Sequence, residues 1–247
     1  MQDDIEQGLL GDCWLLSAMS AVAHSHGHIL EKYTLGNITA TTSKKKNEKN
    51  KKNDIRKNCS INKSFTPISK DGKYDIRIHV DGNWKVITVD DRLPCLRQSQ
   101  SSQSSQSSTT TKSSATPTLV PAFGRSSTKN ELWVSLLEKA IAKHYGSYEA
   151  ITGGLIHVAM SLLTGGIGEM IKIEQAKKLG HVTNGRLWNK MYKLHKDGHL
   201  LAAGSPPIST TGQTAVSDMG IVHGHAYAIL RLIQVCFCSA TRFYFIF

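Results

Sequence analysis

A cysteine near the start of the chain stands where it could act as a nucleophile. Cys13 follows Gly11 and Asp12 in the run QGLLGDCWLLSA and begins an apolar stretch with helical spacing. If Asp12 caps that helix, Cys13 lies in the first turn, where the positive end of the helix dipole favours a thiolate. A buried structural cysteine at the start of an apolar helix explains the same pattern equally well.

A histidine far along the chain could serve as its proton acceptor. His225 follows Gly224 in the run HGHAYAIL and opens an apolar strand. From the edge of a sheet it could take the proton of a thiol and return it to a leaving amine. Taken alone, a histidine in this place is typical of a structural residue, and it is the pairing with Cys13 that favours catalysis.

Periodicity predicts the elements that would position these two residues. Residues 1–35 are apolar and helix-like, and alternation over 72–94 around Asp81-Gly82 predicts a β-hairpin. Thr128 and Glu131 have the spacing of a capping box before a helix over about 129–144. The remaining predicted elements are helices over 155–163 and 184–196, then strands over 200–203 and 225–235. Helices followed by strands favour an α+β fold with two lobes.

Two stretches have the composition of inserts. Residues 41–66 are a Lys/Asn/Ser run, and residues 98–114 contain no apolar side chain, so burial cannot offset their ordering entropy and disorder is predicted there. Eight basic and two acidic residues give 44–57 a charge of +6 out of the total +11. The basic balance therefore comes mainly from one loop, which makes a nucleic-acid-binding face the weaker interpretation.

The remaining composition is typical of a reduced compartment. The five cysteines include no CxxC pair, and no window approaches the roughly 18 apolar residues of a membrane span. We expect a cytoplasmic protein without a membrane span. The HSHGH run holding His24, His26 and His28 could bind a metal, although a polar loop after an apolar helix is the more typical interpretation.

Ordered sequence blocks carry a resemblance to one family. The blocks are Gln7-Gly8 with Gly11 to Leu16, Val89 to Pro94, Leu132-Trp133 with Leu136 to Ala140, Tyr148 to Ala150 with Gly153-Gly154, and Gly224 to Tyr227. In this order they resemble the protease core of the calpains. The resemblance covers most of the chain, apart from the two inserts and the last dozen residues.

The resemblance implies a papain-like, two-lobed cysteine endopeptidase core with an α+β fold. A helical lobe carrying Cys13 would span 1–165, with inserts at 41–66 and 97–118, and an incomplete β-rich lobe carrying His225 would span 166–247. The peptide substrate would lie between the lobes.

The same resemblance assigns roles by position. Cys13 would be the nucleophile, His225 the general base and acid, and Gln7 the side-chain donor of an oxyanion hole completed by the Cys13 N–H. Gly154 and Gly224 match the positions that hold the substrate backbone, where the absence of a Cβ permits close approach. Simple turn glycines explain these two residues equally well.

Calcium is the cofactor that the family likeness implies. Asp4 and Glu131 stand where the acids of a first-lobe site would be, and hard cations favour such carboxylates. Glu131 is equally explained by the capping box. The expected carbonyl ligands would precede Met1, and the acids of a second-lobe site would follow Phe247, so calcium binding is a weak hypothesis.

The departures from the family pattern bear on activity. The family orients its histidine with an asparagine in an Asn-Pro-Trp-Gly motif, and no asparagine follows His225 in these 247 residues. We therefore expect a core cut at both ends, with poor peptidase activity or none. Two hypotheses follow: a calpain-like intracellular endopeptidase acting on protein substrates through a Cys13 acyl-enzyme, or an impaired relative that binds peptides without turnover. A nucleic-acid binder ranks below both.

Overall fold

The fold is taken from a computed structural model, which describes residues 5–30, 69, 71–98, 118–128, 131–207, 216–218, 220–237 and 240–246. The predicted insert over 41–66 lies outside these residues. So does the predicted disordered run, except for Gln98. The insert predicted over 97–118 is described only at its two ends, which belong to strands.

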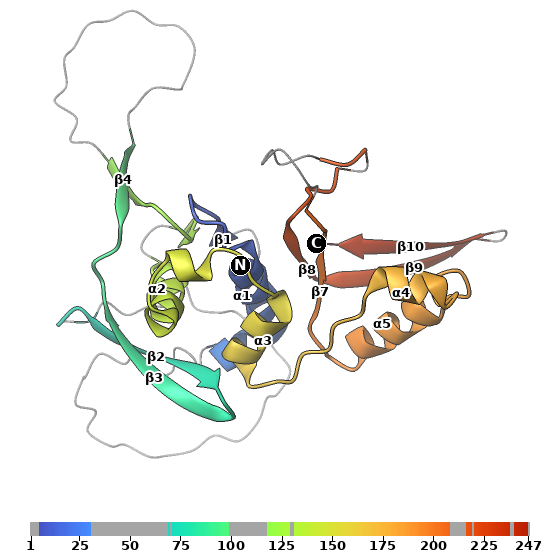
Figure 1. Cartoon of the computed structure of the whole chain (residues 1–247), viewed down its shortest axis with the longest axis horizontal. Helices are drawn as coiled ribbons and strands as arrows, with labels where there is room; N and C mark the ends of the chain where they lie inside the picture. Colours follow the sequence, from blue (N-terminus) through green and yellow to red (C-terminus); the bar gives the residue numbers. More distant parts are fainter. Residues whose placement is uncertain are drawn as a thin grey trace, which may run out of the picture.

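Helices and short antiparallel ribbons make up an α+β fold, as predicted (Figure 1). The helices are α1 (Cys13–Ile29), α2 (Trp133–Tyr145), α3 (Ile156–Thr164), α4 (Ile173–Lys178) and α5 (Arg186–Lys196), with a 3-10 turn η3 (Glu149–Ile151). The strands pair as β1 (Ile5–Glu6) with β6 (Arg125–Ser126), β2 (Lys73–Val80) with β3 (Asn83–Asp90), β4 (Cys95–Gln98) with β5 (Thr118–Pro121), β7 (Leu201–Gly204) with β8 (Ala226–Ile229), and β9 (Arg231–Phe237) with β10 (Ala240–Ile246). Every ribbon is antiparallel.

Helix α1 lies at the centre of the core. Figure 1 shows it in the middle of the molecule, with α3 beside it and with β7 and β8 on the side away from α2. Its apolar side chains are buried nearly all round, including Leu15, Ala18, Met19 and Val22 at 0% exposure. A helix that is apolar on all faces must be enclosed by other elements, and this is why the sequence beginning at Cys13 becomes the central helix.

The β2–β3 hairpin confirms the alternation seen in the sequence. Its turn is at Asp81 and Gly82, both with positive φ (50° and 77°), as the tightest hairpin turns require. Tyr74, Ile76 and Ile78 point inward and are buried against the α2 and α3 side of the core. The opposite face of the hairpin is exposed.

The predicted start of the second long helix is wrong. Helix α2 begins at Trp133 and not near residue 129, and its N-cap Leu132 makes no side-chain capping bond. The Glu131 carboxylate does not accept the Thr128 N–H, which donates to the Ser126 hydroxyl at 3.1 Å. Glu131 Oε2 accepts a hydrogen bond from that hydroxyl at 2.8 Å. The strand pairing of β1 with β6 holds Ser126 close by, so a tertiary contact replaces the capping box.

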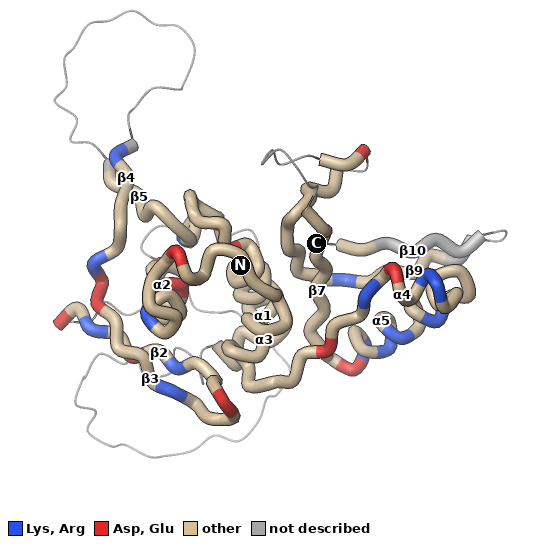
Figure 2. The backbone as a smooth tube through the Cα atoms, viewed as in Figure 1, with Lys and Arg blue, Asp and Glu red and all other residues tan. Residues whose placement is uncertain are grey.

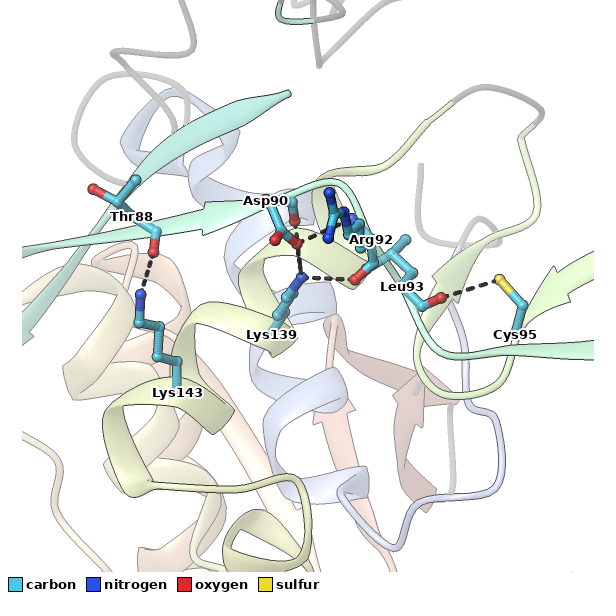
Figure 3. A network of polar contacts seen from close by, with 7 residues as sticks. All are labelled: Thr88, Asp90, Arg92, Leu93, Cys95, Lys139 and Lys143. Atoms are coloured by element: carbon cyan, nitrogen blue, oxygen red, sulfur yellow. Dashed lines mark hydrogen bonds and ion pairs between the residues drawn. The ribbon is translucent and has the colours of Figure 1, made fainter. Parts of the chain in front are cut away.

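Two lysines of α2 hold the end of β3 and the segment after it (Figure 3). The Lys139 amine forms an ion pair with Asp90 and donates to the carbonyl oxygens of Asp90 (3.0 Å) and Arg92 (2.7 Å). Lys143 donates to the Thr88 carbonyl at 2.7 Å. The bonds of Lys139 join two of the sequence blocks that carry the family resemblance, Val89 to Pro94 and Leu136 to Ala140.

The C-terminal part departs from prediction in two places. The short helix α4 was not predicted, and the strand expected over 225–235 is divided at Leu230, whose N–H bonds to the Ile246 carbonyl at 2.8 Å. Helix α5 is amphipathic: Trp188 is buried, whereas Arg186, Lys190, Lys193 and Lys196 are exposed. Figure 2 shows basic positions along α4 and α5. No helix within the described stretches is both long and apolar enough to span a membrane.

Candidate active site

Cys13 is the first residue of α1, as predicted, and it is half-buried. The helix starts because the Asp12 carbonyl accepts hydrogen bonds from the N–H groups of Leu15 (2.8 Å) and Leu16 (3.2 Å). The Asp12 side chain makes no capping bond, so its predicted role as a side-chain cap is wrong. Its carboxylate is instead fully buried behind the helix start.

The loop that carries Gln7 is held by backbone contacts. Gly8 approaches the chain at 122–123 so closely that an added Cβ would lie 2.3 Å from the Ala122 carbonyl oxygen and 2.5 Å from that of Phe123. Leu9 N–H bonds to the Ala122 carbonyl at 2.9 Å. Gln7 itself is exposed, and its Nε2 donates one hydrogen to the Leu10 carbonyl at 2.7 Å. Since an amide nitrogen carries two hydrogens, one donor remains for another acceptor.

Replacing Gly8 by alanine is expected to destabilise the fold, because the new methyl group overlaps backbone atoms that cannot rotate away. Overpacking of this kind costs about 1–3 kcal/mol or more. The control is Gly204→Ala, where an added Cβ has nothing within 4 Å. Urea unfolding should show a clear loss for Gly8→Ala and little change for the control. Equal stability of the two variants would contradict the packing described here.

Gly154 lies against the indole of Trp14, the residue after Cys13. A Cβ at Gly154 would be 2.4 Å from Cε2 and 2.5 Å from Cδ2 of that ring. The Trp14 Nε1 donates to the Ile151 carbonyl at 2.9 Å, and the Gly153 N–H donates to the Gly11 carbonyl at 2.8 Å. These contacts give Gly154 a structural reason to be glycine. Its role in holding substrate stays a prediction.

His225 lies one residue before β8, half-buried, in a turn fixed by Ser205. The Ser205 hydroxyl accepts the His225 N–H at 3.1 Å and is 2.6 Å from the Val222 carbonyl, to which it donates. Gly224 has φ +66°, so its left-handed conformation favours glycine whether or not it touches substrate. The His225 ring meets the Tyr227 ring edge-on, with centroids 4.9 Å apart. Burial lowers the pKa of His225 below its ordinary value, which favours the neutral, proton-accepting imidazole.

One hydrogen bond joins the element of the cysteine to the element of the histidine. The Ser17 hydroxyl of α1 donates to the carbonyl of Ala226, the first residue of β8, at 2.7 Å. Ser17 follows Cys13 by one helical turn, so the two side chains share a face of α1, and Ala226 directly follows His225. The chain therefore brings together two segments separated by about 200 residues, although the pairing of the Cys13 sulfur with the His225 ring stays a prediction.

Sequence reasoning missed three polar residues that shape this region: Ser17, Glu138 and Ser205. Each makes its important contact with a segment distant in sequence. A weak signal was present for two of them, because Ser17 interrupts the apolar run LLSAM and Glu138 lies among the apolar residues of LLEKAIA. A polar residue on a buried helix face requires a partner.

Of the two acids expected to bind calcium, only Glu131 lies among the described residues. Asp4 lies outside them, and the Glu131 carboxylate accepts the Ser126 hydroxyl. In the same part of the chain there is no group of three or more His, Cys, Asp or Glu side chains placed to hold a metal ion, and this covers the HSHGH run as well. The calcium site expected from Asp4 and Glu131 therefore stays a prediction.

Comparison with known proteins agrees with the likeness found in the sequence. Residues 1–244 match the family described as calpain family cysteine protease. The calpain-type cysteine protease ADL1 of Oryza sativa is 34% identical over 94% of this chain, and calpain-9 of Homo sapiens is 29% identical over 95%. The chain spans only 8% of the rice protein and 26% of the human one. The match runs to residue 244, so excluding the last dozen residues from the likeness was wrong.

Proposed function

Because the chain belongs to the calpain family of cysteine proteases, we propose that it cleaves peptide bonds with Cys13 as nucleophile and His225 as general base and acid. The contact of α1 with β8 through Ser17 and Ala226 is the observation that carries this proposal. A two-lobed core divided near residue 165, with the substrate between the lobes, is part of the same proposal.

The proposed chemistry uses groups of this chain only. His225 takes the Cys13 thiol proton, and the sulfur attacks the carbonyl carbon of the scissile bond. The Gln7 amide and the Cys13 N–H donate hydrogen bonds to the carbonyl oxygen and stabilise the negative charge that develops on it. His225 then gives its proton to the leaving amine, which departs and leaves a thioester on Cys13. Water, deprotonated by His225, attacks this thioester and restores the thiol.

A second candidate is a protein that binds peptides without turnover. Among the described residues, no hydrogen bond orients the ring nitrogens of His225, which meets only the Tyr227 ring edge-on. Loss of the orienting group in an analogous triad lowers the rate by about ten-thousandfold. We therefore expect slow hydrolysis at best.

A hydrolysis assay with an extended fluorogenic peptide tests the proposal. Cys13→Ala is expected to remove the slow hydrolysis of the wild type, whereas Cys95→Ala, which changes an exposed cysteine, leaves it intact. If the wild type shows no hydrolysis, specific labelling of Cys13 by a peptide-based electrophile supports the second candidate. Hydrolysis that persists in Cys13→Ala overturns the proposed nucleophile.

Calcium regulation and a cytoplasmic location are the parts of the proposal that rest on the family likeness and the sequence. Family membership also makes proteins the expected substrates. No step above depends on calcium.

A further inference from the structure

Two carboxyl groups are buried together behind the start of α1. Asp12, directly before Cys13, is 0% exposed, and Glu138 of α2 is 1% exposed. The Glu138 carboxyl lies beside Leu16 of α1: a Cβ built on Gly124 would be 3.0 Å from Glu138 Oε1 and 2.8 Å from Leu16 Cδ2. Such a pair is unusual, since two like charges in a buried site repel and lose their hydration.

The Glu138 carboxyl has a hydrogen-bond donor, whereas the Asp12 carboxyl has none among the described residues. Glu138 Oε1 accepts the Gly124 N–H at 2.9 Å, and the Ser135 hydroxyl donates to the Gly124 carbonyl at 2.7 Å. Both oxygens of Asp12 are buried, and no N–H or hydroxyl group among the described residues donates to them. A buried acceptor without a donor costs roughly 1–3 kcal/mol, and more when it is charged. A proton on Glu138 would supply the missing donor.

No nearby positive charge neutralises the two buried carboxyl groups among the described residues. The Tyr148 hydroxyl is the other titratable group within electrostatic reach of Glu138, whose charge raises the pKa of Tyr148. Lys139, the neighbour of Glu138, directs its amine to Asp90 and to backbone carbonyls. Of the described lysines, arginines and histidines, none bonds to either carboxyl. The pair therefore has to be neutralised by a proton.

The protonation equilibria agree with this geometry. Burial, and then the hydrogen bond and charge of Asp12, raise the pKa of Glu138 to about 9, against the opposing effect of the Gly124 N–H. Burial also raises the pKa of Asp12, and its hydrogen bond with Glu138 opposes that rise. The two titrate as a pair, and with a pKa of about 9 Glu138 keeps its proton at neutral pH.

We propose that Glu138 is a positioning residue for the site: as a neutral acid it donates its O–H to Asp12 and so fixes the Asp12–Cys13 peptide group at the start of α1. This rests on the proposed function, because that peptide group carries the Cys13 N–H assigned to the oxyanion. Gly124 completes the arrangement by donating to the same Glu138 carboxyl. Glu138 touches neither substrate nor sulfur; it acts through Asp12.

The sign of the pH dependence follows from the raised pKa. Between the ordinary value of 4.5 and about 9, the folded chain holds a proton on Glu138 that the unfolded chain releases. The stability that Glu138 contributes is fully present below pH 4.5, its pKa in the unfolded chain. It is lost as the pH rises toward about 9, its pKa in the folded chain. Within that window, each pH unit weakens folding by about tenfold in the unfolding equilibrium constant.

Glu138→Gln is the decisive variant, since its amide can donate to Asp12 and accept from Gly124 but does not titrate. From about pH 6 to about pH 8, the unfolding constant of the wild type should rise about a hundredfold more than that of Glu138→Gln. Glu174→Gln, at an exposed glutamate, should behave as the wild type. Parallel curves for wild type and Glu138→Gln would overturn the proposal, whatever the activity of Cys13.

A second measurement separates positioning from stability alone. At neutral pH and within the folded range, Glu138→Gln should keep the wild-type rate of Cys13 labelling by a peptide-based electrophile, whereas Glu138→Leu, which removes the donor, should lower it. If Glu138→Leu does not fold, the comparison rests on Glu138→Gln, and a large loss of labelling there overturns the proposal. Failure of the Cys13→Ala test would overturn the peptidase function but would leave the shared proton and its pH dependence in place.

Discussion

Replacing Trp14 by alanine should cost about 3–5 kcal/mol in the free energy of unfolding, the typical range for a large buried aromatic side chain. Trp14 is 4% exposed, and its ring forms the surface on which Gly154 rests. Its Nε1 also satisfies the buried Ile151 carbonyl, which the substitution would leave without a donor. The loss therefore combines a cavity with an unsatisfied polar group.

The chain contains a matched control for this prediction. Trp84 is the same residue type, but on the hairpin β2–β3 it is 37% exposed. Urea unfolding should show a much smaller loss for Trp84→Ala than for Trp14→Ala. Trp14→Phe should fall between the two, since it keeps most of the volume and removes only the N–H donor. Similar losses for Trp14→Ala and Trp84→Ala would mean that Trp14 does not hold the core beside Cys13.

The sequence predicted correctly those elements that are stabilised by contacts within one short segment. The β2–β3 hairpin follows from alternation and from Asp81-Gly82, because the turn needs only those two residues in positive φ. The start of α1 at Cys13 follows from the apolar run after Gly11. In both cases the pattern and the stabilising contacts lie within the same short segment.

The features that the sequence did not predict depend on contacts between distant segments. The capping box of Thr128 and Glu131 failed because Ser126, fixed by strand pairing, offers Glu131 a better partner. Asp12 was expected to cap α1, but Glu138, 126 positions later, lies against it instead. The six-residue helix α4 is too short for periodicity to reveal.

The candidate site shows the same division. Cys13 and His225 could be selected from their local contexts and from the family likeness. The bond that connects their elements, from Ser17 to Ala226, could not be foreseen, because nothing in the helix pattern specifies which strand covers that face. The contact between α1 and β8 is therefore known only from the structure. Proton transfer from Cys13 to His225 is a matter for experiment.

The central claim is that His225 takes the proton of Cys13. The direct test is the rate at which iodoacetamide alkylates Cys13 near neutral pH, followed by mass spectrometry of the Cys13 peptide so that the other cysteines do not contribute. His225→Ala should slow alkylation by about a hundredfold, the lower range for loss of a general base. The matched control is His223→Ala, two residues away and also half-buried, which should alkylate at the wild-type rate. An unchanged rate in His225→Ala would contradict the pairing on which the proposed peptidase depends.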